Sequence, residues 1–468
     1  MTDGEALYRA ILESPDDDAP RLVWADWLEE NGDPERAEFV RLQCEWAALD
    51  PGDPRQEELW ERWGGLLDRN RDRWTSDLGP LARNCGFWRG LPDWFDVTTG
   101  EMVEQVEALR RYVPAQCLNV QLNLFRDALR EWDGLDSVRC LDIAEKAMDP
   151  YYPHTSLRGW VWLLQCTRLR GLRSIQVEMD IASAGALAAL SGTDWPHLRE
   201  LSIRLHNAEP GKLPNAWTDL PHAMWYAGLK SLDLWGCAIG EEGMACFVLA
   251  YDLPKLTRLG LGMNHISPEV IRGLAKTTGF EELRCIELNG NPVGTAIGDL
   301  LSSSRLPNLC ALAASDVVAE GESSRDLVNA VVAVGWSRLR ILEFNSNALD
   351  TEAVERLVES PAAARLEVLA LNGNDLTDAA AFALAGSPRL RRLRRLDLAG
   401  NRLTDAGLQA LASSPNLPNL RTLTLKHNII SADAIIDFKD TDLARQLWRL
   451  ETDFMDPPRR KYGYEALL

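Results

Sequence analysis

The residues in this sequence that could do chemistry are its histidines, its cysteines and one run of aspartates. None of the six histidines lies in HExxH or in another spacing typical of metal ligands. The nine cysteines are scattered and include no CxxC pair, so we expect reduced, mostly buried thiols. PDDD at 15–18 lacks the spaced oxygen ligands and the glycine of a calcium loop, and we interpret it as a helix-capping turn. The sequence thus predicts no catalytic residue, no metal and no cofactor.

Two further segments resemble binding motifs only superficially. GLGMN (260–264) does not fit a phosphate-binding loop, because it is not a glycine-rich junction between a strand and a helix. We expect Gly260 and Gly262 instead to alternate along a repeat strand and to expose backbone on the sheet face. RLRRLRR (389–395) lacks the interleaved aromatic residues that nucleic-acid binding favours. We interpret it as a solvated edge that leads into a strand. The sequence contains no GxSxG motif and no positioned Cys–His pair, so nucleophilic catalysis has no support.

The elements that position these residues are set by an internal repeat with the template L-x-x-L-x-L-x-x-N/C-x-L. Eight copies start at intervals of 27, 27, 26, 30, 27, 27 and 27 residues, which is too regular for chance. Residues 229–430 therefore form regular repeats. The copies are LKSLDLWGCAI from Leu229, LTRLGLGMNHI from Leu256, LRCIELNGNPV from Leu283, the degenerate LCALAASDVVA from Leu309, LRILEFNSNAL from Leu339, LEVLALNGNDL from Leu366, LRRLDLAGNRL from Leu393 and LRTLTLKHNII from Leu420.

Each part of the repeat predicts a different element. The alternating L-x-L core predicts a short strand with one face inward. The remainder has a helical pattern, clearest in LTDAGLQALASS (403–414), where Thr404 or Asp405 is expected to cap the helix. An Asn or Cys after each strand can bond turn backbone groups that the sheet leaves unpaired. We assign to this ladder Cys237, Asn264, Asn291, Asn347, Asn374, Asn401 and Asn428.

Weaker copies extend the repeat toward the N-terminus. They are LRELSIRLHNA from Leu198, LRSIQVEMDIA from Leu172, VRCLDIAEKAM from Val138 and AQCLNVQLNLF from Ala115, with a further possible strand at WFDV (94–97). We expect the array to begin near residue 85 and to contain about a dozen strands. Because stacked units bury apolar faces that a single unit cannot, the pattern predicts an α/β solenoid with a parallel concave sheet and convex helices.

Repeats of about 27 residues with LTDAGLQAL-type helical segments resemble the ribonuclease-inhibitor class of leucine-rich repeats. The resemblance covers about 200 residues closely and about 340 loosely. It implies a right-handed leucine-rich-repeat solenoid, shaped like a horseshoe, whose concave sheet binds proteins. It is specific for the fold and says little about the partner.

Residues 4–49 predict three short helices, with Pro20 and Pro34 in first turns. An apolar stripe on the second helix is expected to pack inward, and it comprises Leu22, Val23, Trp24, Trp27 and Leu28. The string EALYRAILESPDDDAPRLVWADWLEENGDPERAEFVRLQCEWAAL closely resembles the short repeat-companion domain of planctomycete proteins, which commonly precedes such repeats. This resemblance implies architecture and no chemistry. In residues 55–80, Trp60, Trp63, Leu66 and Leu67 are expected to cover the open end of the first repeat.

These patterns divide the chain into a helical domain (1–50), a helical linker and cap (51–84), a solenoid (85–450) and a C-terminal tail (451–468). The net charge is −20, which repels phosphate backbones and anionic lipids and favours a basic protein partner. The chain start has no basic n-region or long apolar h-region, and no stretch approaches ~18 apolar residues. We therefore expect a cytoplasmic protein that binds neither nucleic acid nor membrane.

The concave face is the predicted binding surface, because the third, fifth and seventh template positions point away from the core. We hypothesise a non-catalytic scaffold that binds a protein with a basic surface; its oligomeric state stays open. Two alternatives are a regulator or inhibitor of a partner enzyme, including a GTPase-activating type, and a sensor or adaptor in bacterial signalling or defence. The candidate contact residues are Asp233, Trp235, Arg258, Glu287, Asn289, Glu343, Asn345, Asn372, Arg395, Asp397 and Lys426.

Overall fold

The computed structural model describes residues 2–14, 17–49, 55–98, 117–121, 138–144, 166–209, 217, 219–245, 253–336 and 338–453. The chain divides into two compact units. The N-terminal unit comprises Met1–Glu178 and Asp194–Leu198, and the C-terminal unit comprises Met179–Thr193 and Arg199–Arg459. The predicted C-terminal tail lies outside the described residues from position 454 onward. The four-part division of the chain stays a prediction.

The first three helices of the N-terminal unit begin where their capping residues predict. They are α1 (Asp3–Glu13), α2 (Asp18–Glu30) and α3 (Pro34–Ala48). Asp17 accepts a hydrogen bond from the Ala19 N–H at 2.9 Å and caps α2, which confirms the capping role of this aspartate run. Asp33 caps α3, and Pro34 occupies its first turn.

The apolar stripe predicted on α2 is partly wrong. Leu22 and Val23 are 41% and 51% exposed, whereas Trp24 and Leu28 are buried. The buried side of α2 also includes Ala25, so its members follow helical spacing, and Leu22 and Val23 fall outside that stripe. The buried residues pack with α1 and α3 in one small core.

A buried arginine sits among aromatic rings where α3 meets α4 (Arg55–Trp74). The Arg36 guanidinium lies 4.5 Å from the Trp74 ring centroid and 5.0 Å from that of Phe87, and burial lowers its pKa to about 9. Phe39 contacts both Trp63 and Phe87. Trp60, Trp63, Leu66 and Leu67 are predicted to cover the open end of the first repeat. Trp63 contacts Phe39 of α3 and is buried, as are Leu66 and Leu67. Phe39 of α3 and Trp74 of α4 both contact Phe87. The cover of the first repeat stays a prediction.

The strands of the N-terminal unit begin with an unpredicted hairpin. After the 3-10 segment η1 (Ser76–Asn84), β1 (Cys85–Trp88) pairs antiparallel with β2 (Leu91–Thr98). Arg89 and Gly90 make the turn with positive φ values of 48° and 87°. Parallel pairing follows through β3 (Cys117–Gln121), β4 (Cys140–Ala144) and β5 (Ser174–Asp180), with η3 (Thr167–Gly171) before β5. The strand predicted at 94–97 lies within β2.

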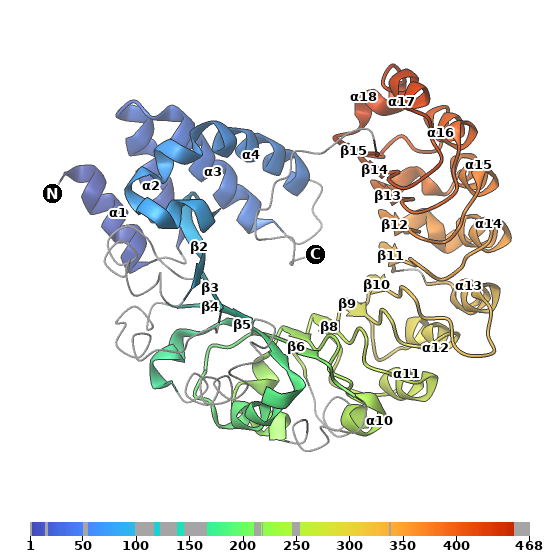
Figure 1. Ribbon diagram of the computed structural model, residues 1–468, viewed down its shortest axis with the longest axis horizontal. Coiled ribbons are helices and arrows are strands. Elements are labelled where there is room, and N and C mark those ends of the chain that lie inside the picture. Colours follow the sequence, from blue (N-terminus) through green and yellow to red (C-terminus); the bar gives the residue numbers. More distant parts are fainter. Residues whose placement is uncertain are drawn as a thin grey trace, which may run out of the picture. The chain divides into compact units, whose positions relative to one another are not determined.

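The C-terminal unit repeats one strand per template copy, and its strands lie side by side in chain order (Figure 1). Every strand pair from β6 to β15 is parallel. The strands are β6 (Glu200–His206), β7 (Ser231–Asp233), β8 (Arg258–Gly260), β9 (Cys285–Glu287), β10 (Ala311–Ala313), β11 (Ile341–Glu343), β12 (Val368–Ala370), β13 (Arg395–Asp397), β14 (Thr422–Thr424) and β15 (Arg449–Glu451). The described residues thus hold 15 strands, against the dozen or so predicted.

Helical segments cover the other side of this unit, opposite the strands in Figure 1. The buried residues of these segments are mostly apolar, and the strand leucines are buried as well. They are η4 (Ile181–Gly192), η5 (Leu220–His222), η6 (Tyr226–Gly228), α10 (Gly240–Gly243), α11 (Pro268–Leu274), α12 (Ala296–Ser302), α13 (Ser324–Ala333), α14 (Thr351–Glu359), η8 (Pro361–Arg365), α15 (Asp378–Gly386), η9 (Leu390–Arg392), α16 (Asp405–Ala412), α17 (Ala432–Phe438) and α18 (Asp442–Gln446). Thr404, one of the two candidates, caps α16.

The predicted asparagine ladder joins each repeat to the preceding one. Asn374 Nδ2 donates to the Phe344 carbonyl at 2.9 Å, and its Oδ1 accepts from the backbone N–H groups of Asn347 and Leu349. Cys237 makes the analogous contact through its thiol, which donates to the Ile203 carbonyl at 3.2 Å. Equivalent bonds to the preceding strand's carbonyl are made by Asn264, Asn291, Asn347, Asn401 and Asn428.

Candidate functional site

The outward face of β7–β15 carries carboxylates on alternate strands. The last residues of these strands are in register across the sheet. We call the carboxylates in this register the acidic row; its members are Asp233, Glu287, Glu343, Asp397 and Glu451. The intervening strands place small side chains at the same level, namely Gly260, Ala313, Ala370 and Thr424.

This alternation sets the spacing of negative charge. Neighbouring strands lie ~4.8 Å apart, so consecutive carboxylates of the acidic row are separated by ~9.6 Å at the backbone. The side chains of the residues between them are short, so they project less from the sheet than the carboxylates do. A partner therefore meets separate anionic points rather than one continuous cluster.

Two glycines make room for the side chains at the start of the face. A Cβ on Gly262 would lie 2.6 Å from Trp235 Cδ1, so the indole lies directly over this glycine. A Cβ on Gly260 would collide with the Asp233 carboxylate. The expectation that Gly260 and Gly262 expose backbone is therefore wrong. Asp233 and Trp235 cover the two glycines, and both glycines are buried. Trp235 itself is 43% exposed and available for contact.

Arg258 is bound within the face rather than free for a partner. Its Nη2 lies 2.6 Å from Glu287 Oε1, and both side chains are about a quarter exposed. Burial raises the pKa of the Glu287 carboxyl, although Arg258 acts to lower it. Arg258 and Glu287 therefore offer a partner a paired charge.

The middle of the acidic row is less compensated. Among the described residues, no hydrogen-bond donor or cation lies within bonding distance of the Glu343 carboxylate. Burial raises the pKa of Glu343, and the more distant Arg395 acts to lower it. Burial also raises the pKa of Asp397, even though its carboxylate accepts from the Ala399 N–H at 2.9 Å. Half-buried carboxylates of this kind gain from an approaching cation, because ionisation is costly there without one.

The C-terminal end of the face carries ion pairs that the sequence interpretation did not include. Lys426 Nζ lies 3.6 Å from Glu451 Oε2, and Arg449 forms an ion pair with the same carboxylate. Lys426, a predicted contact residue, is therefore already paired within the face. Glu451 lies one 27-residue interval after Thr424, so continuing the repeat phase past residue 430 would have found it.

The predicted contact asparagines also have structural bonds. Asn289 Oδ1 accepts from the Ser315 N–H at 2.8 Å, and Asn345 Oδ1 accepts from the Asn372 N–H at 2.8 Å. These bonds tie the seventh template position of one repeat to the backbone of the next. The Asn289 and Asn345 side chains are half-buried at the edge of the face.

The thiols in and near the face are poor nucleophiles. Burial raises the pKa of Cys285 to about 12, and it raises the pKa of Cys310 and Cys237 as well. The seven cysteines whose side chains the structure describes are free; three are buried and four half-buried. Within the described ranges, no group of three or more His, Cys, Asp or Glu side chains is arranged to hold a metal ion. None of the helices described there is long and apolar enough to span a membrane.

The strand-and-helix unit, its leucine core and its asparagine ladder define an α/β solenoid of leucine-rich repeats. Sequence models of leucine-rich repeats match residues 391–437, 229–248 and 365–385. Over 94 residues, 19% of this chain, the sequence is 34% identical to a Tonsoku-like protein from Bos taurus. That match spans 7% of the Tonsoku-like protein's length.

Two solved structures resemble the chain at low sequence identity. An internalin from Listeria monocytogenes matches 74% of each chain at 17% identity with a TM-score of 0.31. The yeast Rad7 and Elc1 complex matches 91% of this chain and 94% of the other at 13% identity with a TM-score of 0.45.

Proposed function

We propose that this chain is a non-catalytic scaffold that binds a protein with a basic surface on the outward face of β7–β15. The observation that carries the proposal is the acidic row, with half-buried carboxylates on every second strand. Raised carboxyl pKa values at Glu343 and Asp397 indicate negative charge that neither solvent nor a bonded cation compensates completely. Cationic side chains of a partner would supply that compensation.

Trp235 gives the same face an apolar contact. An exposed tryptophan beside charged groups is a frequent centre of binding energy in protein interfaces. It lies in the turn after β7, two residues beyond Asp233, the first residue of the acidic row. The partner's basic groups would then lie along the sheet, across the strands, starting from a contact with the indole.

The spacing of the row narrows the partner's geometry. Cationic groups that engage consecutive members must be ~9.6 Å apart or slightly closer, because the face curves inward. Basic residues at i and i+2 of an extended strand, ~6.7 Å apart, would miss alternate members. Basic residues seven apart on a helix are ~10.5 Å apart and would stay in step over two or three contacts.

The cysteines bear on two further parts of the proposal, the compartment and the absence of catalysis. Free thiols suit a reducing compartment, so we place the protein in the cytoplasm. The raised thiol pKa values favour binding over nucleophilic catalysis. The ribonuclease-inhibitor-like subclass and the planctomycete-type N-terminal domain stay part of the proposal.

The test compares two triple variants in quantitative affinity capture from the native lysate. The first changes the face: Trp235→Asp, Glu287→Lys and Glu343→Lys. The matched control makes the same chemical changes on the helical side at exposed positions: Phe382→Asp on α15 with Glu355→Lys and Glu359→Lys on α14. The face variant should lose its stoichiometric partner, and the control should retain it.

The proposal is wrong if every stoichiometric partner survives the face variant. It is also wrong if the control variant loses the same partner equally, since binding would then depend on net charge or on the helices. Far-ultraviolet circular dichroism of both variants confirms that each is folded before capture.

A further inference from the structure

The N-terminal unit contains a cavity lined by cationic side chains, separate from the acidic row. It has a volume of about 270 Å³, and its lining comprises Arg139, Arg170, Gly171, Arg173 and His197. This volume is slightly below the ~300 Å³ lower end of pockets for drug-sized ligands. The cavity therefore suits a smaller ligand.

The repeat itself brings two of the arginines together. Arg139 immediately precedes β4 and Arg173 immediately precedes β5, so both occupy the second template position of successive copies. The Arg139 carbonyl accepts from the backbone N–H groups of Arg173 and Ser174 at 2.7 and 3.0 Å. Their backbones are thus fixed side by side at the same end of adjacent strands.

The other lining residues come from the connecting segments. Arg170 and Gly171 end η3, one turn before β5, and His197 belongs to the short segment Asp194–Leu198. Gly171 has no side chain to fill the space. The cavity is therefore bounded by the starts of two strands and by one 3-10 turn.

The charge of this lining contrasts with the rest of the chain. Guanidinium groups stay protonated in proteins, so three fixed positive charges border one cavity in a chain whose net charge is −20. One of the three charges is already paired, because Asp194 Oδ2 lies 3.0 Å from Arg170 Nε; the two side chains are 47% and 63% exposed, respectively. A ligand with several anionic oxygens could engage Arg139 and Arg173 in paired hydrogen bonds that a single carboxylate cannot satisfy together.

We propose that this cavity binds a small phosphate-bearing anion with at least two phosphoryl groups. Arg139 and Arg173 hold one phosphoryl group from adjacent strands. His197 contacts the other, together with Arg170, which the ligand shares with Asp194. The site is independent of protein binding on β7–β15.

The test is isothermal titration calorimetry of the full-length chain with inorganic pyrophosphate at low ionic strength. One molecule should bind per chain. Arg139→Gln and Arg173→Gln should each weaken affinity at least about fivefold, and the double variant at least about twentyfold, because each change removes one charge-assisted contact. Arg168→Gln is the matched control: it removes the same charge from η3 at a residue outside the lining, and affinity should not change.

Further titrations separate the ligand classes. Affinity for ADP equal to or above that for pyrophosphate would identify a nucleotide site, and weaker ADP binding a site for free phosphate compounds; either supports the proposal. Citrate binding as tightly as pyrophosphate would overturn the phosphate assignment. The site is wrong if pyrophosphate does not bind, or if the double variant, folded by circular dichroism, retains wild-type affinity.

Discussion

At the residue scale, a single asparagine side chain forms hydrogen bonds with several backbone groups that would otherwise be unpaired. Asn374 is 2% exposed and bonds three backbone groups of the preceding repeat, while its own N–H donates to Asn401 Oδ1. The turn after each strand has no ladder partner for these groups. The asparagine position therefore determines how consecutive turns stack.

Asn374→Ala should lower the free energy of unfolding by at least about 2 kcal/mol, because it leaves buried N–H and C=O groups without partners at about 1–3 kcal/mol each. Asn329→Ala on α13 is the control, since Asn329 makes an exposed bond with Arg356. Urea denaturation followed by circular dichroism measures both. An unchanged midpoint for Asn374→Ala would contradict the structural role of the ladder.

Gly262 permits the position of Trp235, so Gly262→Ala tests that position without removing the indole. The new Cβ would lie 2.6 Å from Trp235 Cδ1 and must displace the ring. We expect a shift in tryptophan fluorescence and about tenfold weaker partner binding. Gly386→Ala, where a Cβ meets nothing within 4 Å, should change neither. Wild-type binding by Gly262→Ala would remove Trp235 from the interface.

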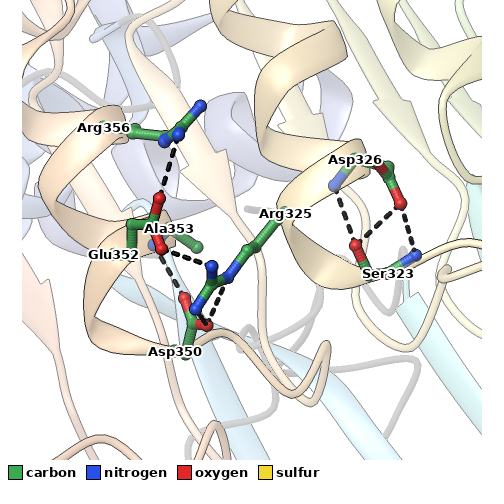
Figure 2. Close-up of polar contacts among 7 residues, drawn as sticks. All are labelled: Ser323, Arg325, Asp326, Asp350, Glu352, Ala353 and Arg356. Carbon is green, nitrogen blue, oxygen red and sulfur yellow. Dashed lines mark hydrogen bonds and ion pairs between the residues drawn. The ribbon is translucent and has the colours of Figure 1, made fainter.

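At the element scale, helix ends and helix-to-helix ion pairs contribute differently. Figure 2 shows Ser323 and Asp326 in a capping box at the start of α13. The same view shows Arg325 reaching Asp350 and Glu352 at the start of α14. The cap satisfies free backbone N–H groups, whereas the ion pairs are exposed to water and screened.

Ser323→Ala should therefore destabilise the chain by about 1 kcal/mol, and Arg325→Ala by less than about 0.5 kcal/mol. High salt should abolish the smaller effect and leave the larger one. Thermal unfolding with and without added salt distinguishes the two. Equal, salt-sensitive losses would show that electrostatics dominates this helix end.

The raised carboxyl pKa values of the acidic row predict how partner binding depends on pH. Glu287, Glu343 and Asp397 have raised pKa values in the free protein, mainly through burial. A bound cation favours the carboxylate and lowers those values, so the complex holds fewer protons than the free protein. Affinity should therefore fall as the pH drops through the raised pKa values, beginning above the ordinary carboxyl range of about 4.

The contribution of these three carboxyl groups to the free energy of unfolding should rise as the pH falls, whereas the affinity for the partner falls. A carboxyl whose folded pKa is raised above its unfolded value favours the proton in the native state, so its ionisation cost disappears as the pH falls. Binding measured by surface plasmon resonance across this range, with unfolding measured alongside, separates the two effects. Loss of affinity in step with unfolding would contradict the assignment to the acidic row.

At the scale of the whole molecule, the C-terminal unit is a stack in which each repeat contacts its neighbours. Strand β12 is paired on both sides, with β11 and β13, whereas β15 is the last described strand and pairs with β14. Repeat arrays lose structure from such ends because terminal repeats lack one interface. Stability should therefore vary along the unit.

Hydrogen exchange should show this gradient directly. We expect amides of β15 to exchange at least about a hundredfold faster than those of β12 under native conditions, because local opening of an end costs less than opening the middle. Mass spectrometry of peptic fragments provides the measurement. Uniform protection from β12 to β15 would show that the unit opens only as a whole, as a two-state domain does.

The sequence by itself determined the fold of the repeats and the asparagine ladder. In a 27-residue repeat with leucines at fixed positions, the apolar faces are buried by stacking the repeats into a solenoid. Strand, turn and helix could therefore be placed from the spacing alone. The helices of residues 4–49 followed from caps and prolines in the same way. These features depend on local pattern, which a single sequence displays.

Only the tertiary structure decided which outward residues remain available. Contacts between repeats paired Arg258 with Glu287 and Lys426 with Glu451, although each pair lies 25 or more residues apart in sequence. Register across strands aligned carboxylates on every second strand, and it placed Arg139 beside Arg173. Charge pairing and burial depend on neighbours brought together by stacking. The template gave each side chain its direction, and the packed repeats determined what it meets.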